Sequence, residues 1–147
     1  MIAIAFRRSV PLTFWSQVVR LFAGAPVHCA IVLPDGTGWE AQLGVGVQPV
    51  FVPPDDADWE RVPVQAKALT AIRFAHRRAG ARYDLLGAVL YGTPLTSRDR
   101  WTCSELCAEA LAEAGAPLSI LPAGRTPRRL RAWALAHTHT ETPHHAV

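Results

Sequence analysis

A cysteine at the predicted start of a helix is the residue of this chain best suited to covalent chemistry. In Trp101-Thr102-Cys103-Ser104-Glu105, Thr102 suits the N-cap and Glu105 follows three residues later, which is the pattern of a capping box. Cys103 is then the first helical residue, where unused backbone N–H groups and the helix dipole favour an anion. A thiolate is favoured there, and the thiolate is the nucleophilic form of cysteine. The spacing therefore predicts a reactive cysteine as well as a helix.

The same helix carries a second cysteine, Cys107, for which we expect a different role. The apolar residues repeat at the spacing of a core-facing stripe, and the helix is expected to end at Gly115 and Pro117. The stripe consists of Cys103, Leu106, Cys107, Ala110, Leu111 and Ala114. A buried cysteine usually acts as a small apolar side chain. We therefore interpret Cys107 as packing and Cys103 as the candidate nucleophile.

A cysteine nucleophile needs a base, and one of the six histidines is expected to be held rigidly by a sheet. His28 lies in the β-rich run Val27–Leu33, which is followed by the turn signal Pro34-Asp35-Gly36. His76 falls in an arginine-rich helical stretch, and the other four histidines lie near the C-terminus. His28 is thus the candidate base.

Two polar residues on the next predicted strand could orient His28. Glu40 and Gln42 share a face of that strand, and hairpin pairing brings one of them opposite or diagonal to His28, depending on the register. Glu40 would stabilise an imidazolium, whereas Gln42 could only orient it. A charged residue at a sheet edge with no catalytic role is the alternative for Glu40. Because neighbours on a strand face opposite ways, we expect Cys29 to point away from the helix that His28 faces.

The order of the predicted elements indicates an α+β domain, in which a small antiparallel sheet packs against helices. Strands are predicted over Ile2–Phe6, Val27–Leu33, Trp39–Leu43, Val45–Val52 and Asp58–Val64, and helices over Pro11–Ala23, Gln65–Ala79, Tyr83–Tyr91, Cys103–Gly115 and Thr126–Leu135. The loops Pro53–Asp58 and Thr93–Arg100 are expected to form the rim of the site.

Length and composition predict one globular domain. The 147 residues are 50% hydrophobic and 18% charged, which is typical of a folded chain. We assign residues 1–136 to the domain and expect the histidine-rich segment 137–147 to be a disordered tail. Three cysteines without framework spacing argue against a disulfide scaffold and favour a reducing compartment.

Neither a membrane span nor a secretory signal is recognised. No apolar run approaches the roughly 18 residues of a spanning helix, and Met1–Phe6 is too short and too quickly followed by Arg7 to be a signal peptide. We therefore expect a cytoplasmic protein, with export by another route left open. The net charge of +3 rests on arginines, and no aromatic residues interleave with them as in nucleic-acid-binding proteins. We expect solvated helix faces and no nucleic-acid partner.

In order and spacing, these segments resemble the circularly permuted branch of the NlpC-type papain-like cysteine hydrolases, such as the YiiX-like proteins and the lecithin:retinol acyltransferase group. In ordinary papain-like enzymes the cysteine helix precedes the histidine strand, and here the order is reversed. The resemblance rests on Val27-His28-Cys29-Ala30-Ile31-Val32, Trp39-Glu40-Ala41, Gly44-Val45-Gly46-Val47, Tyr83-Asp84 with Gly87, Trp101-Thr102-Cys103-Ser104-Glu105-Leu106, and Thr126-Pro127 with Leu130.

The resemblance implies a thiol hydrolase or acyltransferase of papain-like fold. Cys103 and His28 would form the catalytic pair with Glu40 as third member, Gln42 would be the alternative to Glu40, and Tyr83 would lie near the pocket. Such a site needs no cofactor or metal ion. Substrates of this superfamily range from cell-wall peptides to acyl lipids, so the expected partner is a peptide or an acyl lipid bearing an amide, ester or thioester.

Two other classes of function stay open. A binding module could keep this fold and have lost turnover. A metal site could use Cys103, Cys107 and histidines of the tail, although two cysteines spaced i, i+4 lack a matching second pair of ligands.

Overall fold

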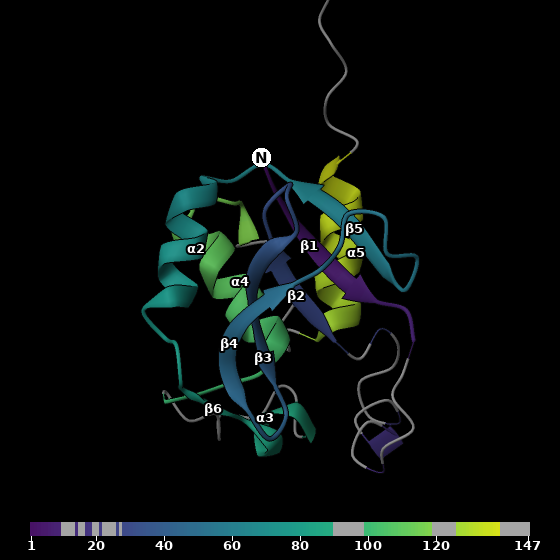
Figure 1. Ribbon diagram of the computed structural model, residues 1–147, viewed down its shortest axis with the longest axis vertical. Coiled ribbons are helices and arrows are strands. Elements are labelled where there is room, and N and C mark those ends of the chain that lie inside the picture. The colour runs from purple at the N-terminus through teal and green to yellow at the C-terminus, as the bar shows by residue number, and fades with distance from the viewer. Residues whose placement is uncertain are drawn as a thin grey trace, which may run out of the picture.

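A five-stranded antiparallel sheet forms the centre of the computed structural model (Figure 1). The model describes residues 1–9, 14, 17, 18, 21, 26, 28–89, 99–118 and 126–138. The helix predicted over residues 11–23 falls mostly outside the described residues, as does most of the loop predicted over residues 93–100. The α+β class predicted from the sequence is confirmed by the described elements.

All five predicted strands are present, with ends that differ by a few residues. They run antiparallel to their neighbours in the order β4-β3-β2-β1-β5. Their bounds are β1 Ile2–Arg7, β2 Cys29–Val32, β3 Thr37–Gln42, β4 Gly46–Phe51 and β5 Trp59–Val64. The turn between β2 and β3 requires Gly36, which has φ +92° and a Cβ position occupied by the Val52 carbonyl at 2.3 Å.

The strands alternate between two apolar clusters, one on each face of the sheet. Ile4 and Ile31 belong to the larger cluster, which also contains the buried side chains of the helices. Ala5 and Ala30 belong to the smaller cluster on the other face. Since directly paired residues share a face, the pairing of Ala30 with Glu40 puts the Glu40 side chain on the second face.

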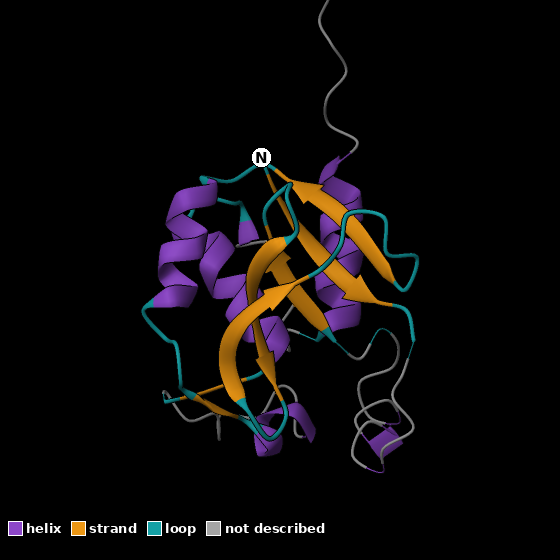
Figure 2. Cartoon of the chain, in the orientation of Figure 1, coloured by secondary structure: helices purple, strands orange, loops and turns teal. Residues whose placement is uncertain are grey.

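Helices α2 (Ala68–His76), α4 (Cys103–Glu113) and α5 (Pro127–Thr138) pack around the larger cluster. All three contact the sheet, and α4 lies between α2 and α5 (Figures 1 and 2). Every residue of the predicted apolar stripe of α4 is buried. Ser104 and Ala108 are buried as well, and both α2 and α5 pack against α4.

A second, two-stranded sheet leads into α4. Strands β6 (Arg82–Tyr83) and β7 (Arg100–Trp101) pair in parallel, with Tyr83 opposite Trp101. Tyr83 was predicted to begin a helix, and this is wrong: the helix α3 spans Leu85–Val89. The physical reason is Asp84, whose Oδ1 accepts a 2.8 Å hydrogen bond from the Gly87 N–H and thereby caps α3 after the strand pairing has ended.

The last described helix extends past residue 136, the predicted end of the domain. Helix α5 continues to Thr138, and the His137 ring stacks on Trp133 with 4.8 Å between ring centroids. His137 Nδ1 also donates to the Trp133 carbonyl at 2.7 Å, which adds a side-chain hydrogen bond to the last turn of α5. The remainder of the predicted tail, residues 139–147, lies outside the described residues.

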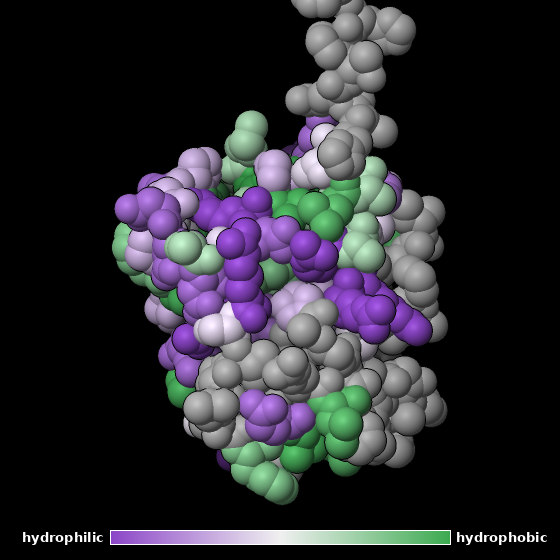
Figure 3. Space-filling view, turned by 90° about the vertical axis from the view of Figure 1, so that its right-hand side faces the viewer, coloured by the Kyte–Doolittle hydropathy of each residue, from purple (hydrophilic) through white to green (hydrophobic). Residues whose placement is uncertain are grey.

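Hydrophilic side chains gather across the middle of the face that carries β5 and α5 (Figure 3). Arg128 and Arg129 of α5 are exposed, and Arg131 Nη2 donates to Glu60 Oε1 at 2.8 Å. The exposure of Arg128 and Arg129 agrees with the solvated helix face expected from the sequence, whereas Arg131 is half-buried in its ion pair with Glu60. None of the helices among the described residues combines the length and the apolar character that crossing a membrane requires.

Candidate active site

The predicted capping box is present at the start of α4. Thr102 has the extended backbone of an N-cap, with φ −82° and ψ 161°. Its Oγ1 accepts a hydrogen bond from the Glu105 N–H at 3.2 Å, and Glu105 Oε2 accepts one from the Thr102 N–H at 3.1 Å. These two bonds fix where the helix begins, and Cys103 is its first residue. The Cys103 side chain is fully buried.

His28 lies immediately before β2, at the end of the sheet. Its carbonyl accepts a hydrogen bond from the Arg7 N–H at 3.1 Å, which anchors it beside the last residue of β1. The His28 and Trp59 rings make an edge-to-face contact, with ring centroids 5.8 Å apart. The side chain is 18% exposed, so the imidazole is held by neighbours but reaches solvent.

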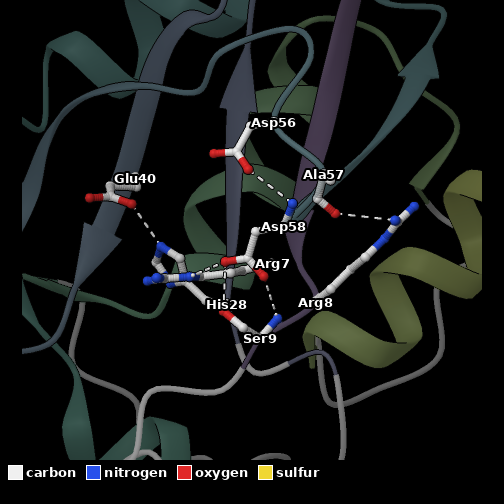
Figure 4. A network of polar contacts seen from close by, with 8 residues as sticks. All are labelled: Arg7, Arg8, Ser9, His28, Glu40, Asp56, Ala57 and Asp58. Atoms are coloured by element: carbon white, nitrogen blue, oxygen red, sulfur yellow. Dashed lines mark hydrogen bonds and ion pairs between the residues drawn. The ribbon is translucent and has the colours of Figure 1, made fainter.

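Glu40, and not Gln42, contacts His28. His28 Nε2 and Glu40 Oε2 are 2.7 Å apart, as the dashed line in Figure 4 shows. The register explains the choice, because Glu40 pairs with Ala30 and is therefore diagonal to His28 on the same face. Gln42 lies two residues further along β3 on the same face, and its Oε1 accepts a hydrogen bond from Gln48.

Gln48 is a residue of this site that the sequence reasoning missed. It lies directly opposite Glu40 on β4, and its Nε2 donates to Glu40 Oε1 at 2.9 Å. Both carboxylate oxygens of Glu40 are therefore bonded, one to His28 and the other to Gln48. The period-two pattern of the predicted hairpin was the available signal, since it places Gln48 on the face of Glu40 once the turn at Gly44 is recognised.

The imidazole of His28 lies between Cys103 and Glu40, since it also hydrogen-bonds the Cys103 side chain. Nε2 faces Glu40, so Nδ1 is the nitrogen left for the sulfur. The structure thus brings together three of the predicted site residues, Cys103, His28 and Glu40. Tyr83 lies in β6 and pairs with Trp101, which precedes Cys103 by two residues.

The electrostatics of these three groups favour a charged arrangement. Burial lowers the pKa of His28, but hydrogen bonds to Cys103 and Glu40 outweigh it and raise the pKa to about 10. Burial raises the pKa of Glu40, yet the contacts with His28 and Gln48 leave it below its ordinary value. Near neutral pH, His28 is therefore an imidazolium and Glu40 beside it is a carboxylate.

The pKa of Cys103 is well below its ordinary value. A hydrogen bond from the Cys29 thiol is the largest cause, burial acts in the opposite direction, and the hydrogen bond and charge of His28 add to the lowering. This shift favours the thiolate of Cys103, which is the species needed for nucleophilic attack.

Cys29 was predicted to point away from the cysteine helix, and this is wrong. Cys29 and Ile31 face α4 as part of the larger apolar cluster, and Cys29 hydrogen-bonds both Cys103 and Cys107. Burial and these neighbouring sulfur atoms raise the pKa of Cys29. The prediction failed because Cys103 lies at the end of the sheet, where His28 from one face and Cys29 from the other can both reach it.

A polar network lies beside His28, at the predicted rim (Figure 4). Asp58 Oδ2 accepts hydrogen bonds from Arg7 Nε at 3.2 Å and from Ser9 Oγ at 2.6 Å. The Arg7 guanidinium carbon is 5.9 Å from the centroid of the Trp59 ring, whose edge contact with His28 links the network to the site. The end of the loop 53–58 is thus adjacent to the candidate base.

Among the described residues, no group of three or more His, Cys, Asp or Glu side chains is arranged to hold a metal ion. The tail histidines His139, His144 and His145 fall outside this part of the chain. In comparisons with known proteins, no protein family, curated protein or solved structure matches this chain. The site is therefore interpreted from its own geometry.

Proposed function

We propose that this protein is a permuted papain-like cysteine hydrolase or acyltransferase that acts on an amide, ester or thioester of a peptide or an acyl lipid. The observation that carries the proposal is the placement of the His28 imidazole between Cys103 and Glu40, with Cys103 at a capped helix start. A nucleophile, a base in contact with it and a group that orients the base form the minimal set for covalent acyl transfer.

The chain order supports the permuted form of the papain-like fold. The histidine-bearing end of β2 and the Glu40 strand β3 come first, and the cysteine helix α4 follows about 60 residues later, against the same sheet. The resemblance in sequence has the same order. The order of the elements is thus consistent with the proposed family, and the chemistry of the site can be derived without it.

In the first half-reaction, the Cys103 thiolate attacks the carbonyl carbon of the substrate. A bond forms between Sγ and carbon, and the carbonyl electrons move to oxygen, where the N–H groups at the start of α4 stabilise the negative charge. His28 then gives its proton to the leaving nitrogen, oxygen or sulfur as the tetrahedral intermediate collapses. The products are a thioester on Cys103 and the released group.

In the second half-reaction, neutral His28 takes a proton from water or from an acceptor amine or hydroxyl. That nucleophile attacks the thioester carbon, and the Cys103 thiolate leaves. Glu40 keeps the imidazole in place and stabilises its positive charge in both steps. Water makes the protein a hydrolase, and an organic acceptor makes it an acyltransferase.

The proposal is tested first by alkylation of Cys103 with iodoacetamide across pH, with the modified residue identified by mass spectrometry. We expect rapid labelling well below pH 8.5, the ordinary range of a thiol. The Cys107→Ala variant, which leaves Cys103, His28 and Glu40 in place, should give the same profile, and Cys103→Ala should remove the label. A Cys103 profile with its midpoint near pH 8.5 contradicts the proposal.

The substrate class is tested with a panel of cell-wall peptides and acyl esters, using Cys103→Ala as the blank. Turnover should be accompanied by a mass increase on Cys103 equal to the acyl group when the reaction is stopped with acid. Release of product that is equally fast with Cys103→Ala would show that the activity does not come from this site.

A non-catalytic binding module on the same fold is favoured by one observation, the absence of exposed surface on Cys103. The alkylation experiment separates the two functions. A nucleophile that serves substrates must be labelled in the folded protein, whereas a structural thiol reacts only after denaturation. Failure of iodoacetamide to label Cys103 without denaturant would favour the binding module.

A further inference from the structure

Three buried cysteines meet at the junction of the sheet and α4. Cys29 is the first residue of β2, and Cys103 and Cys107 occupy the first two turns of α4. None of the three is in a disulfide or has exposed surface, and all belong to the same apolar cluster. The proposed acyl transfer uses only Cys103, so the position of Cys29 against it needs a separate explanation.

The arrangement makes Cys29 the partner of Cys103 for disulfide formation. The two residues come from elements that face each other across the core, and their side chains are hydrogen-bonded. Cys107 follows one helical turn after Cys103, so that both Cβ atoms point in the same direction. A disulfide requires Cβ atoms that approach each other, which favours the pair across the core over the pair along the helix.

We propose that Cys29 is a resolving thiol for Cys103 and that peroxide converts the two into an intramolecular disulfide that reversibly switches the site off. The inference rests on the proposed function, because it uses the same reactive thiolate, but it does not require turnover. The oxidant is hydrogen peroxide, which is smaller than any acyl substrate.

The chemistry proceeds in two balanced steps. The Cys103 thiolate attacks one peroxide oxygen, an S–O bond forms, the O–O bond breaks, and the departing hydroxide takes the proton of His28 to become water. Cys103 is oxidised to the sulfenic acid and the peroxide is reduced. The Cys29 sulfur then attacks the Cys103 sulfur, an S–S bond forms, the S–O bond breaks, and the Cys29 proton leaves with the hydroxyl group as a second water.

The first step also prepares the second. Burial is the largest cause of the raised pKa of Cys29, and the hydrogen bond and negative charge of the Cys103 thiolate raise it further. Oxidation to the neutral sulfenic acid removes that charge, so the Cys29 proton is lost more easily. A dithiol such as dithiothreitol reverses the disulfide, whereas further oxidation of Cys103 to the sulfinic acid is not reversed by thiols. Cys29 therefore protects the nucleophile from permanent damage.

The test is treatment of the folded full-length protein with hydrogen peroxide, followed by blocking with N-ethylmaleimide and peptide mass mapping. Cleavage after Glu105 separates Cys103 from Cys107, so that each linkage can be assigned. We expect a Cys29–Cys103 linked peptide in the native protein and recovery of alkylatable Cys103 with dithiothreitol.

The variants Cys29→Ser and Cys107→Ser are the matched pair. Cys29→Ser keeps a hydrogen-bond donor beside the thiolate but cannot form the disulfide, so Cys103 should accumulate as sulfinic acid and lose its recovery by dithiothreitol. Cys107→Ser should behave like the native protein. If Cys29→Ser does not fold, Cys29→Ala serves in its place, with folding checked by circular dichroism.

Two results would overturn the inference while leaving the proposed function intact. One is a Cys103 that iodoacetamide labels readily but that peroxide takes to the sulfinic acid as fast in the native protein as in Cys29→Ser. The other is a disulfide that links Cys107 in place of Cys29 or Cys103. A Cys103 that reacts with neither peroxide nor iodoacetamide would contradict the proposed function as well.

Discussion

The carboxylate of Glu40 is held from two sides, and this defines the site at the scale of single residues. Oε2 contacts His28 at 2.7 Å and Oε1 contacts Gln48 at 2.9 Å. A carboxylate bonded at both oxygens cannot turn away from the imidazole without breaking the bond to Gln48. The orientation of the base therefore depends on β4 as well as on the two strands that carry His28 and Glu40.

We predict that Gln48→Leu slows alkylation of Cys103 at pH 6 by about two- to tenfold, the effect of losing one hydrogen bond of about 0.5–1.5 kcal/mol. The loosened carboxylate stabilises the imidazolium less well, and the thiolate is favoured less. Gln42→Ala is the control, because Gln42 bonds Gln48 but not Glu40. Equal rates for Gln48→Leu and the native protein would show that Gln48 only packs.

The His28–Glu40 pair also makes a prediction about stability and pH. The folded pKa of His28 is about 10, above its unfolded value near 6.5, so its contribution is full below about pH 6.5 and is lost as the pH rises through 10. Glu40 has a lowered pKa in the folded state, so its contribution is full above its unfolded value near 4.3 and is lost in acid.

Glu40→Gln should therefore lower the free energy of unfolding by about 1–3 kcal/mol at pH 5–6.5, and by less at pH 10. Urea unfolding at the two pH values measures the difference. Glu113→Gln is the matched control. Glu113 pairs with Arg77 at 3.7 Å, and both side chains are mostly exposed, so this substitution should change the free energy of unfolding by less than about 0.5 kcal/mol. A loss for Glu40→Gln that is the same at both pH values would contradict the charged state of His28.

At the scale of elements, α4 combines a fixed start with nearly complete burial. The capping box sets Cys103 as the first residue, and burial on several sides prevents the helix from sliding or rotating. Because the first residue of this helix is fixed, the position of the Cys103 sulfur varies little. This is the kind of rigid support that a catalytic group requires.

Thr102→Val should destabilise the protein by about 1 kcal/mol and also slow alkylation of Cys103, because the first turn of α4 loses a cap. Thr126→Val removes the corresponding bond of α5, where Thr126 Oγ1 accepts from the Arg129 N–H at 3.2 Å. It should cost a similar free energy in chemical denaturation but leave the alkylation rate unchanged. A similar slowing in both variants would mean that the rate reports stability and not the helix start.

At the scale of the whole molecule, the sheet and the lead-in to α4 are joined at one close approach. The Val47 N–H donates to the Ala81 carbonyl and the Gly80 N–H donates to the Val47 carbonyl, both at 2.8 Å. These bonds tie β4 to the chain that enters β6, which pairs with β7 directly before Cys103. The edge of the sheet that carries Gln48 is thus tied to the segment that delivers the nucleophile.

Gly46 allows this approach. It has φ +95°, and a Cβ at this position would lie 2.2 Å from the Ala81 carbonyl oxygen. We predict that Gly46→Ala lowers the free energy of unfolding by about 2–5 kcal/mol, combining left-handed strain with a steric clash.

Gly44→Ala is the matched variant for Gly46→Ala. Its φ of +84° is similar, but a Cβ there meets nothing within 4 Å, so only the strain of about 1 kcal/mol is expected. Chemical denaturation of both variants measures the difference. Equal losses would show that β4 and the segment at Ala81 are not closely joined in solution.

The sequence by itself determined the features that depend on neighbours along the chain. The capping box, the apolar stripe of α4 and the five strands follow from spacings of two to four residues, which is the range over which backbone hydrogen bonds and side-chain periodicity act. The strand at Tyr83 was missed because its pairing partner, Trp101, lies 18 residues away along the chain.

Only the tertiary structure decided which of the possible partners meet. The choice of Glu40 over Gln42 depended on the register of β2 and β3, and the bond from Gln48 depended on that of β4. The contact of Cys29 with Cys103 depended on where α4 begins against the sheet, more than 70 residues later in the chain. The physical reason is that register and helix placement are set by packing of the whole core, which local sequence patterns do not contain.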